Sequence, residues 1–220
     1  MSAFLEHPLL AARGAAHGFG VRGAAEPAGL ARPRQVHGVA VARARGDGMP
    51  LGDADAVWSD APGTAVGVVT ADCVPILLAG RGARIVAAVH AGWRGLADGV
   101  IGAALEALRA AGAPAGELVA AIGPHIGPCC YEVDEPVLAR LRARFPAAID
   151  AHAHATRPGH ARVDLGALAR RELEGALPPG AVGALADACT RCDAQRFESY
   201  RRDGARSGRL VHWIRVSPRG

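Results

Sequence analysis

The chain has 220 residues, of which 50% are hydrophobic, and its formal net charge is +4. A chain of this length can bury one substantial core, and none of its apolar runs reaches the ~18 residues that a membrane-spanning helix requires. All 25 basic residues are Arg, mostly interleaved with acidic residues, so the charge favours an anionic small-molecule ligand over nucleic acid. The N-terminus lacks the basic start and long apolar stretch of a signal peptide, which predicts a cytoplasmic protein.

In the first half of the chain, short runs of small and β-branched residues predict strands. Residues 35–45 alternate between apolar and polar positions, which is typical of a strand with one buried face. A loop rich in Gly, Pro and Asp follows at 47–56. Three apolar runs bounded by turn residues then predict buried strands at 64–70, 74–79 and 83–90.

In the second half, apolar residues that recur every three or four positions predict helices, and short apolar runs between them predict strands. The predicted helices span 96–112, 134–145 and 164–177, the predicted strands span 117–123 and 208–216, and 152–161 is a polar loop. The strict alternation of strands and helices along the chain that is typical of a doubly wound sheet is missing. The sequence therefore predicts an α+β (mixed α/β) fold, a single domain of mixed β-sheets flanked by helices.

Two histidines and one cysteine stand at the ends of predicted buried strands, each beside turn residues: His37, Cys73 and His90. Two imidazoles and one thiolate suit Zn²⁺, and three protein ligands leave the fourth tetrahedral position open, as in catalytic sites. An ion bound there would lower the pKa of a water molecule to ~7. Taken singly, each residue is equally compatible with a buried polar group that forms a local hydrogen bond.

The segment 121–133 contains two Gly-Pro pairs followed by the adjacent Cys129 and Cys130. Repeated Gly and Pro make a rigid turn whose backbone N–H groups can face phosphate or a ribose, and a purely structural double turn is the alternative. We interpret the two cysteines as buried thiols or pocket lining, because adjacent residues do not easily chelate one metal ion. His125, in the middle of this loop, either faces the pocket or is solvated.

A C-x-x-C pattern formed by Cys189 and Cys192 occurs near the C-terminus. A single pair cannot make a four-cysteine zinc site unless Cys129 and Cys130 join it. A redox dithiol would require a thioredoxin-like βαβ context, which the pattern does not predict. The odd total of five cysteines in a cytoplasmic chain argues against a disulfide framework.

Seven ordered blocks together resemble the family long called multicopper polyphenol oxidase or laccase-domain, and also peptidoglycan editing factor. The blocks are RQVHG (34–38), DADAVWSDAPG (53–63), TADCVPILLA (70–79), VAAVHAGWRG (86–95), IGPHIGPCCYEV (122–133), DL with ARREL (164–173) and CTRCDAQRFESYRRD (189–203). The resemblance implies that residues 1–220 form one domain. The part before residue 34 is shorter than the family's usual pattern by roughly thirty to forty residues.

The resemblance implies that His37, Cys73 and His90 are the zinc ligands. It implies phosphorolysis of adenosine, inosine, guanosine or methylthioadenosine, and hydrolytic deamination of adenosine. The ligands would then be a purine nucleoside and phosphate, and the assembly a monomer or homodimer without nucleic-acid or membrane partners. Copper is less well supported than zinc, because one set of two His and one Cys is not a multicopper arrangement.

The remaining candidate residues are expected to act on the substrate. Asp72, next to Cys73, is a candidate acid that protonates the leaving amine. Arg94 could hold phosphate or only brace the turn that follows His90. The candidate substrate- or phosphate-binding residues offer a guanidinium or a backbone N–H: Arg22, Arg94, Gly123, Gly127, Arg201 and Arg202.

Two other classes of protein stay open. One is a zinc- or cysteine-dependent hydrolase of a peptidoglycan precursor, with Cys73 as nucleophile and His90 as its base. The other is a non-enzymatic zinc-binding or redox-responsive protein that uses the five thiols.

Overall fold

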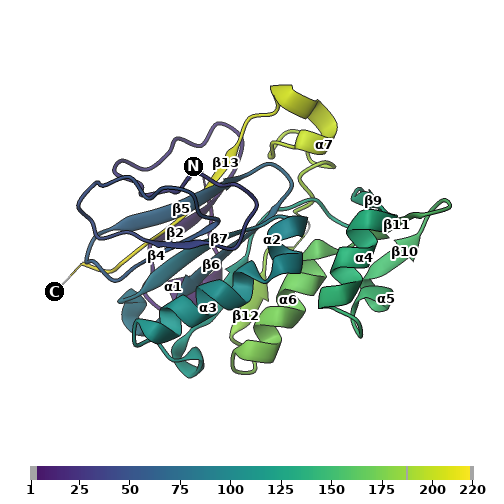
Figure 1. Ribbon diagram of the computed structural model, residues 1–220. Coiled ribbons are helices and arrows are strands. Elements are labelled where there is room, and N and C mark those ends of the chain that lie inside the picture. The colour runs from purple at the N-terminus through teal and green to yellow at the C-terminus, as the bar shows by residue number, and fades with distance from the viewer. Residues whose placement is uncertain (1–3, 187, 219–220) are drawn as a thin grey trace.

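A six-stranded mixed sheet forms the centre of the computed structural model, which describes residues 4–186 and 188–218 (Figure 1). Its strand order is β12-β8-β6-β7-β4-β3, and the inner pairs are antiparallel whereas the two outer pairs are parallel. The strands are β3 (Val41–Arg43), β4 (Ala56–Ser59), β6 (Val74–Ala79), β7 (Val86–Ala91), β8 (Val119–Ile122) and β12 (Val182–Ala184).

A four-stranded antiparallel sheet packs against this central sheet, with β5 and β13 next to β4, β6 and β7. Its order is β1-β2-β13-β5. The strands are β1 (Phe4–Leu5), β2 (His17–Gly20), β5 (Ala65–Thr70) and β13 (Leu210–Arg215). The terminal segments of the described chain are therefore joined in one sheet, because β13 pairs with both β2 and β5.

Helices cover the other face of the central sheet (Figure 1). These are α2 (Trp93–Asp98), α3 (Val100–Ala110) and α6 (Leu165–Ala176), while the short α1 (Pro8–Ala11) lies beside β8. A small third sheet at the side contains β9 (Glu132–Asp134), β10 (Ala153–Ala155) and β11 (His160–Val163), with α4 (Glu135–Arg144) and α5 (Ile149–His152) nearby; α7 (Tyr200–Asp203) precedes β13. The predicted α+β class with mixed sheets is confirmed.

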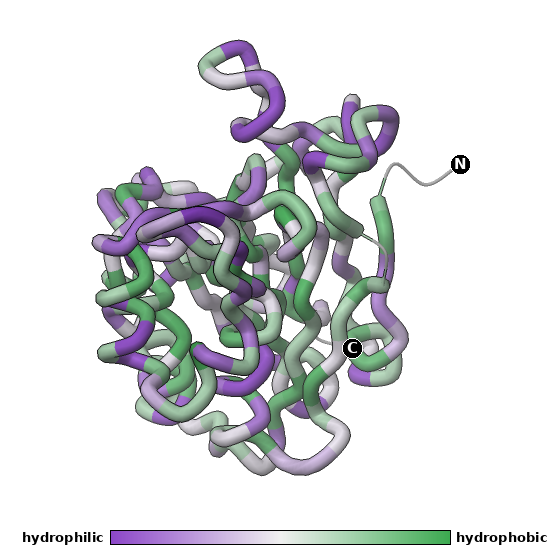
Figure 2. Tube along the Cα trace, turned by 90° about the vertical axis from the view of Figure 1, so that its right-hand side faces the viewer, coloured by the Kyte–Doolittle hydropathy of each residue, from purple (hydrophilic) through white to green (hydrophobic). Residues whose placement is uncertain are grey.

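Strands β6 and β7 are buried along their whole length because they lie between the second sheet and the helices. Strands covered on both faces read as continuous apolar runs without alternation, which explains the sequences VPILLA and VAAVHA. Figure 2 shows the same arrangement, with hydrophobic segments crossing the centre and hydrophilic ones in the outer loops. Within the described residues, no helix is both long and apolar enough to span a membrane.

Three predicted elements differ from the structure. The strand predicted over 35–45 is reduced to β3, because residues 36–38 instead wrap around a buried carboxylate, as described below. The helix predicted over 96–112 is two helices, since Gly99 adopts a left-handed φ of 94° between them. The loop predicted over 152–161 forms most of the β10–β11 hairpin.

His212 of β13 is a fully buried, uncharged imidazole. The Gly20 N–H donates to its Nδ1 at 3.3 Å, so Nε2 carries the proton and lies 2.8 Å from Thr70 Oγ1. Burial, and to a smaller extent the charge of His90, lowers the pKa of His212 to about 3.

This shift predicts that His212 reduces the stability of the protein in acid. Between pH 6.5 and pH 3 the unfolded chain binds a proton on this ring that the folded chain does not, so stability falls as the pH falls. The loss attributable to His212 is about 2 kcal/mol between pH 7.5 and pH 5. Urea unfolding in the presence of a chelator measures it against His212→Gln, which does not titrate. Equal losses in the two proteins would contradict the prediction.

Candidate metal centre and cavity

The folded chain brings together the three residues that the sequence singled out. His37 lies in the loop before β3, Cys73 in the turn between β5 and β6, and His90 in β7. Their candidate ligand atoms all lie within 4.8 Å of one another. Cys73 Sγ is 4.0 Å from His37 Nε2, and the two imidazole rings meet edge to face with centroids 4.8 Å apart.

Asp55, directly before β4, holds two of these residues in place. Its fully buried carboxylate accepts a hydrogen bond from His90 Nδ1 at 2.8 Å and one from the His37 N–H at 2.9 Å. The N–H groups of Val36 and Gly38 bond to its other oxygen, which bends the chain so that His37 has a φ of 61°. Because Nδ1 of His90 is bound to Asp55, Nε2 is the nitrogen left for a metal ion.

The backbone leaves room for an ion only because residue 92 is Gly. A Cβ at Gly92 would lie 2.9 Å from His37 Cδ2 and 3.2 Å from Cys73 Sγ. Two imidazoles, one thiol and a carboxylate that orients an imidazole are the groups that hold zinc or copper in proteins. The donor set and its spacing therefore fit a metal ion.

Cys73 and His90 shift each other's pKa toward the charged forms. Burial alone would raise the pKa of the Cys73 thiol, but the imidazoles of His37 and His90 outweigh it and lower the pKa to about 6. Burial would lower the pKa of His90, yet its bonds to Asp55 and Cys73 raise that pKa to about 9. The site thus favours the thiolate, which is the form that binds metal or attacks a substrate.

A cavity of about 550 Å³ opens above the cluster. This volume lies within the range of small-molecule sites. The lining combines the three candidate ligands with aromatic and basic side chains. It comprises Arg32, Pro33, Arg34, Gln35, His37, Val69, Thr70, Ala71, Asp72, Cys73, His90, Trp93, Arg94, Tyr131, Tyr200, Arg201 and Arg209.

Several basic side chains of this lining are not neutralised by acidic ones. Among the described residues, Arg94, Arg201 and Arg209 form no ion pair, whereas Arg32 and Arg34 pair with Glu26 and Asp53. The Arg94 guanidinium lies over the Trp93 ring, 4.7 Å from its centroid. The cavity is therefore electropositive and suits an anion.

Asp72 lines the cavity, but its carboxylate is engaged in hydrogen bonds. One oxygen accepts from Thr190 Oγ1 at 2.6 Å, and the other accepts from the Arg201 N–H at 2.7 Å. Its backbone has a φ of 91° and its side chain is buried. Asp72 thereby fastens the segment containing residues 190–201 to the turn that carries Cys73.

Two predicted arginines lie outside the cavity lining. Arg22 forms an ion pair with Glu198 at 3.2 Å and donates to the Phe197 carbonyl. Arg202 pairs with Asp203 and donates to the Phe197 and Thr190 carbonyls. Both therefore brace the chain around α7.

The two predicted glycines also lie outside the lining, and their N–H groups have protein partners. Gly123 donates to the Pro75 carbonyl, and Gly127 donates to Cys189 Sγ at 3.3 Å. A Cβ at residue 123 would collide with Phe19 at 2.1 Å, so Gly is needed here for packing. His125 bonds to the Gly123 carbonyl and packs against α6. Of the two interpretations of this loop, the structure favours the structural double turn.

The interpretation of Cys129 and Cys130 as buried thiols or pocket lining is wrong. Cys129 is exposed, Cys130 is half-buried, and neither lines the cavity. Both lie instead beside Cys189 and Cys192.

Sequence reasoning missed three residues that shape the site. Asp55 was hidden in a loop rich in Asp, although its position between two Ala at the start of a strand is a signal of burial. Tyr131 follows the cysteine pair and forms part of the cavity wall. Gln35 pairs through its amide with the N–H and carbonyl of Val69, a contact for which the sequence holds no signal.

The fold and the cluster define a mixed α+β protein with a candidate metal centre of two His and one Cys beneath a basic cavity. Residues 19–217 match the family described as multi-copper polyphenol oxidoreductase laccase, and the chain belongs to that family. The resemblance inferred from the seven sequence blocks is thus confirmed.

Proteins similar to the chain include two named enzymes and one solved structure. The purine nucleoside phosphorylase of Pseudomonas aeruginosa is 42% identical over 184 residues, which cover 82% of this chain and 71% of that protein. Adenosine deaminase RL5, from an unknown prokaryotic organism, is 38% identical over 195 residues, covering 84% and 74%. The crystal structure of YlmD from Geobacillus stearothermophilus has a TM-score of 0.86 at 25% identity, covering 99% and 100%.

Proposed function

We propose that the chain is a zinc-dependent enzyme that cleaves purine nucleosides with phosphate and deaminates adenosine. The observation that carries the proposal is the position of the His37–Cys73–His90 set at a cavity lined by unpaired Arg and aromatic side chains. The names of the two similar enzymes support the same substrates.

Zinc suits the set better than copper. Three ligands leave one tetrahedral position for water or substrate, as in catalytic zinc sites. A mononuclear copper site with two His and one Cys usually has a Met as weak axial ligand. Met49, the one methionine among the described residues, is 66% exposed and lies outside the cavity lining. When bound, zinc would supply a Lewis acid that polarises the substrate or activates water.

In phosphorolysis, a phosphate oxygen forms a bond to ribose C1′ while the bond from C1′ to the purine nitrogen breaks and the purine takes up a proton. Arg94 and Arg201, which line the cavity without an acidic partner, would hold the phosphate dianion against C1′. Trp93 and Tyr131, whose rings stack against the guanidinium groups of Arg94 and Arg201, add aromatic surface to the wall beside the purine. In deamination, water replaces the amino group at C6 and ammonia leaves.

A general-acid role for Asp72 stays a prediction. Both of its oxygens accept hydrogen bonds, so we assign the carboxylate to positioning the chain from Thr190 to Arg201, which carries part of the phosphate site.

Replacing Arg94 should weaken phosphate binding. We expect Arg94→Gln to raise the KM for phosphate by about tenfold, or ~1.4 kcal/mol, because one unpaired guanidinium is lost from the cavity. Arg34→Gln is the matched control: it removes the same charge from the same lining, but from a side chain already paired with Asp53. Steady-state kinetics with phosphate as the varied substrate measures both. A role limited to bracing the turn would leave the KM of the Arg94 variant unchanged.

Product analysis of the zinc-loaded chain tests the proposed function. With adenosine and phosphate, we expect adenine and ribose 1-phosphate from phosphorolysis, together with inosine, ammonia and hypoxanthine from deamination followed by phosphorolysis of inosine. Without phosphate, we expect only inosine and ammonia. A fully loaded, folded chain that makes neither set of products would overturn the proposal and leave a non-enzymatic zinc-binding protein.

One observation favours a second candidate, a cysteine hydrolase that acts on a peptidoglycan precursor. The Cys73 thiol lies within 4.8 Å of the His90 imidazole, which lowers the pKa of the thiol, and cysteine nucleophiles are activated by a neighbouring imidazole in this way. In that case alkylation of Cys73 would abolish activity in a metal-free chain that is otherwise active.

A further inference from the structure

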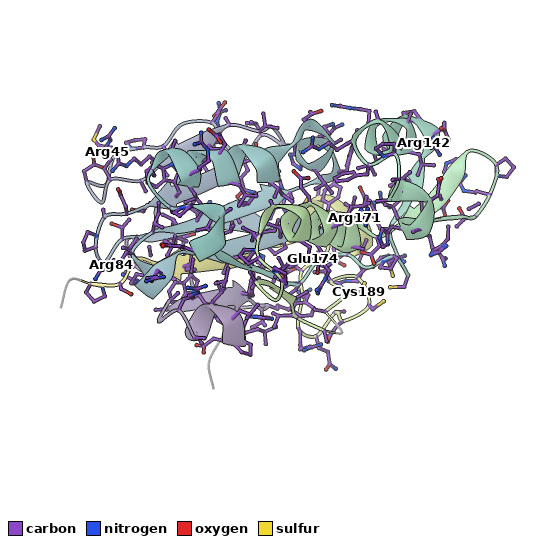
Figure 3. All side chains as sticks on the ribbon, turned by 90° about the horizontal axis from the view of Figure 1, so that it is seen from below. Arg45, Arg84, Arg142, Arg171, Glu174 and Cys189 are labelled. Atoms are coloured by element: carbon purple, nitrogen blue, oxygen red, sulfur yellow. The ribbon has the colours of Figure 1, made fainter. Side chains whose placement is uncertain are left out.

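Four cysteines outside the cavity meet at a second place in the fold. Cys129 and Cys130 lie in the loop between β8 and β9, and Cys189 and Cys192 lie in the segment between β12 and α7. Cys189, labelled in Figure 3, lies in the loop after β12, and none of the four cysteines lines the cavity. The two cysteine pairs are about sixty positions apart in sequence, so only the fold unites them.

The four sulfur atoms lie close enough together to share one metal ion. Cys129 Sγ is 3.6 Å from Cys189 Sγ and 3.6 Å from Cys192 Sγ, and Cys130 Sγ is 3.4 Å from Cys192 Sγ. All four sulfur atoms lie within 4.8 Å of one another. Four thiolates around zinc, with Zn–S bonds of ~2.3 Å, have S–S edges of about 3.8 Å. A disulfide would instead require an S–S distance of ~2.05 Å.

We propose that these four cysteines form a second metal site, a closed tetrathiolate zinc centre. Four protein ligands leave no position for water or substrate, which marks a structural site and not a catalytic one. The adjacency of Cys129 and Cys130, which argued against shared chelation in the sequence, is overcome because the turn after Gly127 brings both thiols into contact with Cys192.

The groups around the four cysteines are of the kind that stabilise negatively charged thiolate ligands. The Gly127 N–H donates to Cys189 Sγ at 3.3 Å, and hydrogen bonds of this kind stabilise the charge on a coordinating sulfur. The Arg191 guanidinium lies against the Cys130 thiol and offsets part of the negative charge that four thiolates and one Zn²⁺ carry. Gly127 lies directly beside the ligands, since a Cβ built on it would be 3.4 Å from both Cys129 Sγ and Cys189 Cβ.

A metal ion at this site would join two segments of the chain that contribute to the cavity or support its wall. Tyr131, which directly follows Cys130, lines the cavity wall. Thr190, which directly follows Cys189, donates to Asp72, the neighbour of Cys73. A metal ion across the four thiols would fix both segments, so its contribution is to stability and to the shape of the cavity. The inference does not depend on the proposed function, because it concerns a separate set of ligands.

Metal content of the full-length chain tests the proposal. We expect two zinc ions in the wild type, one in Cys73→Ala and one in Cys192→Ser. Cobalt titration of the Cys73→Ala chain should give the strong sulfur-to-cobalt charge-transfer absorption of four thiolates, and Cys73→Ala/Cys192→Ser should give none. A folded Cys73→Ala chain that binds no metal, or whose mass shows the four thiols joined as disulfides, would overturn the proposal.

Measuring the Tm with and without a chelator tests the proposal even if a cysteine variant folds poorly. A chelator should lower the Tm of Cys73→Ala by about 5–10 °C, because the remaining metal binds only the folded chain. The same chelator should leave the Tm of Cys73→Ala/Cys192→Ser unchanged. An unchanged Tm in Cys73→Ala would contradict a structural metal at the four cysteines.

Discussion

Cys73→Ala should reduce kcat/KM for phosphorolysis and for deamination at least about 10³-fold, which corresponds to ~4 kcal/mol of transition-state stabilisation. Cys73 is the one thiol in the His37–Cys73–His90 set, and its thiolate supplies the negative charge that balances a divalent ion there. Two imidazoles without it are a poor zinc site. We therefore expect the variant to hold one metal ion fewer than the wild type, measured by elemental analysis alongside the two assays.

Cys73→Asp separates the ligand role of Cys73 from a nucleophilic one. A carboxylate is an accepted zinc ligand but does not form a thioester, so this variant keeps a ligand while removing the nucleophile. If Cys73 is a ligand, Cys73→Asp should regain part of the metal and part of the activity that Cys73→Ala loses. Full metal with no activity in Cys73→Asp, or full activity in a Cys73→Ala chain that has lost this ion, would contradict the ligand role.

The candidate ligands were predictable from the sequence because each stands in a distinctive local context. A polar residue at the end of a buried strand costs free energy unless it has a partner. Each of these three residues stands in such a position within a block that resembles the family, so the three together predicted a shared ligand role. The buried strands β5, β6 and β7 were predictable for a similar reason, since short apolar runs between turn residues have few other structures available.

The loop around His37 was not predictable in this way. The alternation over 35–45 favours a strand locally, but three backbone hydrogen bonds from residues 36–38 to one buried carboxylate outweigh that preference. Asp55 is 18 residues from His37 and 35 from His90, so its role appears only once β4 and β7 are paired. The four-cysteine cluster depends in the same way on the parallel pairing of β8 and β12.

Residue type alone does not predict which Arg side chains are available to bind phosphate. Arg22, Arg94, Arg201 and Arg202 were equal candidates for phosphate, and nothing local distinguishes them. In the folded chain Arg22 and Arg202 pair with carboxylates near α7, whereas Arg94 and Arg201 reach the cavity without an acidic partner, although Arg201 also donates to the Glu132 carbonyl. Which guanidinium is available to a ligand is a property of tertiary structure.

Asp55→Asn should damage both the fold and the metal centre, although Asp55 touches neither the cavity nor the ion. Each carboxylate oxygen of Asp55 accepts two hydrogen bonds: one from the His90 Nδ1–H and the His37 N–H, the other from the Val36 and Gly38 N–H groups. An amide must turn its NH₂ group toward one of these pairs of donors, whichever way it is flipped, which leaves buried donors unsatisfied. We expect the free energy of unfolding to fall by about 3 kcal/mol. Zinc affinity should fall by about 10- to 100-fold.

Asp53→Asn is the matched control. It removes the same charge only two residues from Asp55, but the Asp53 side chain is exposed and pairs with the exposed Arg34. An exposed pair of this kind contributes about 0–1 kcal/mol, so unfolding and zinc affinity should change little. Urea unfolding and competition with a chromogenic chelator give the two quantities for both variants. If the metal ion itself orients His90, Asp55→Asn would lose stability and keep wild-type zinc affinity. A loss of both shows that the carboxylate sets the position of His37 and His90 before the ion arrives.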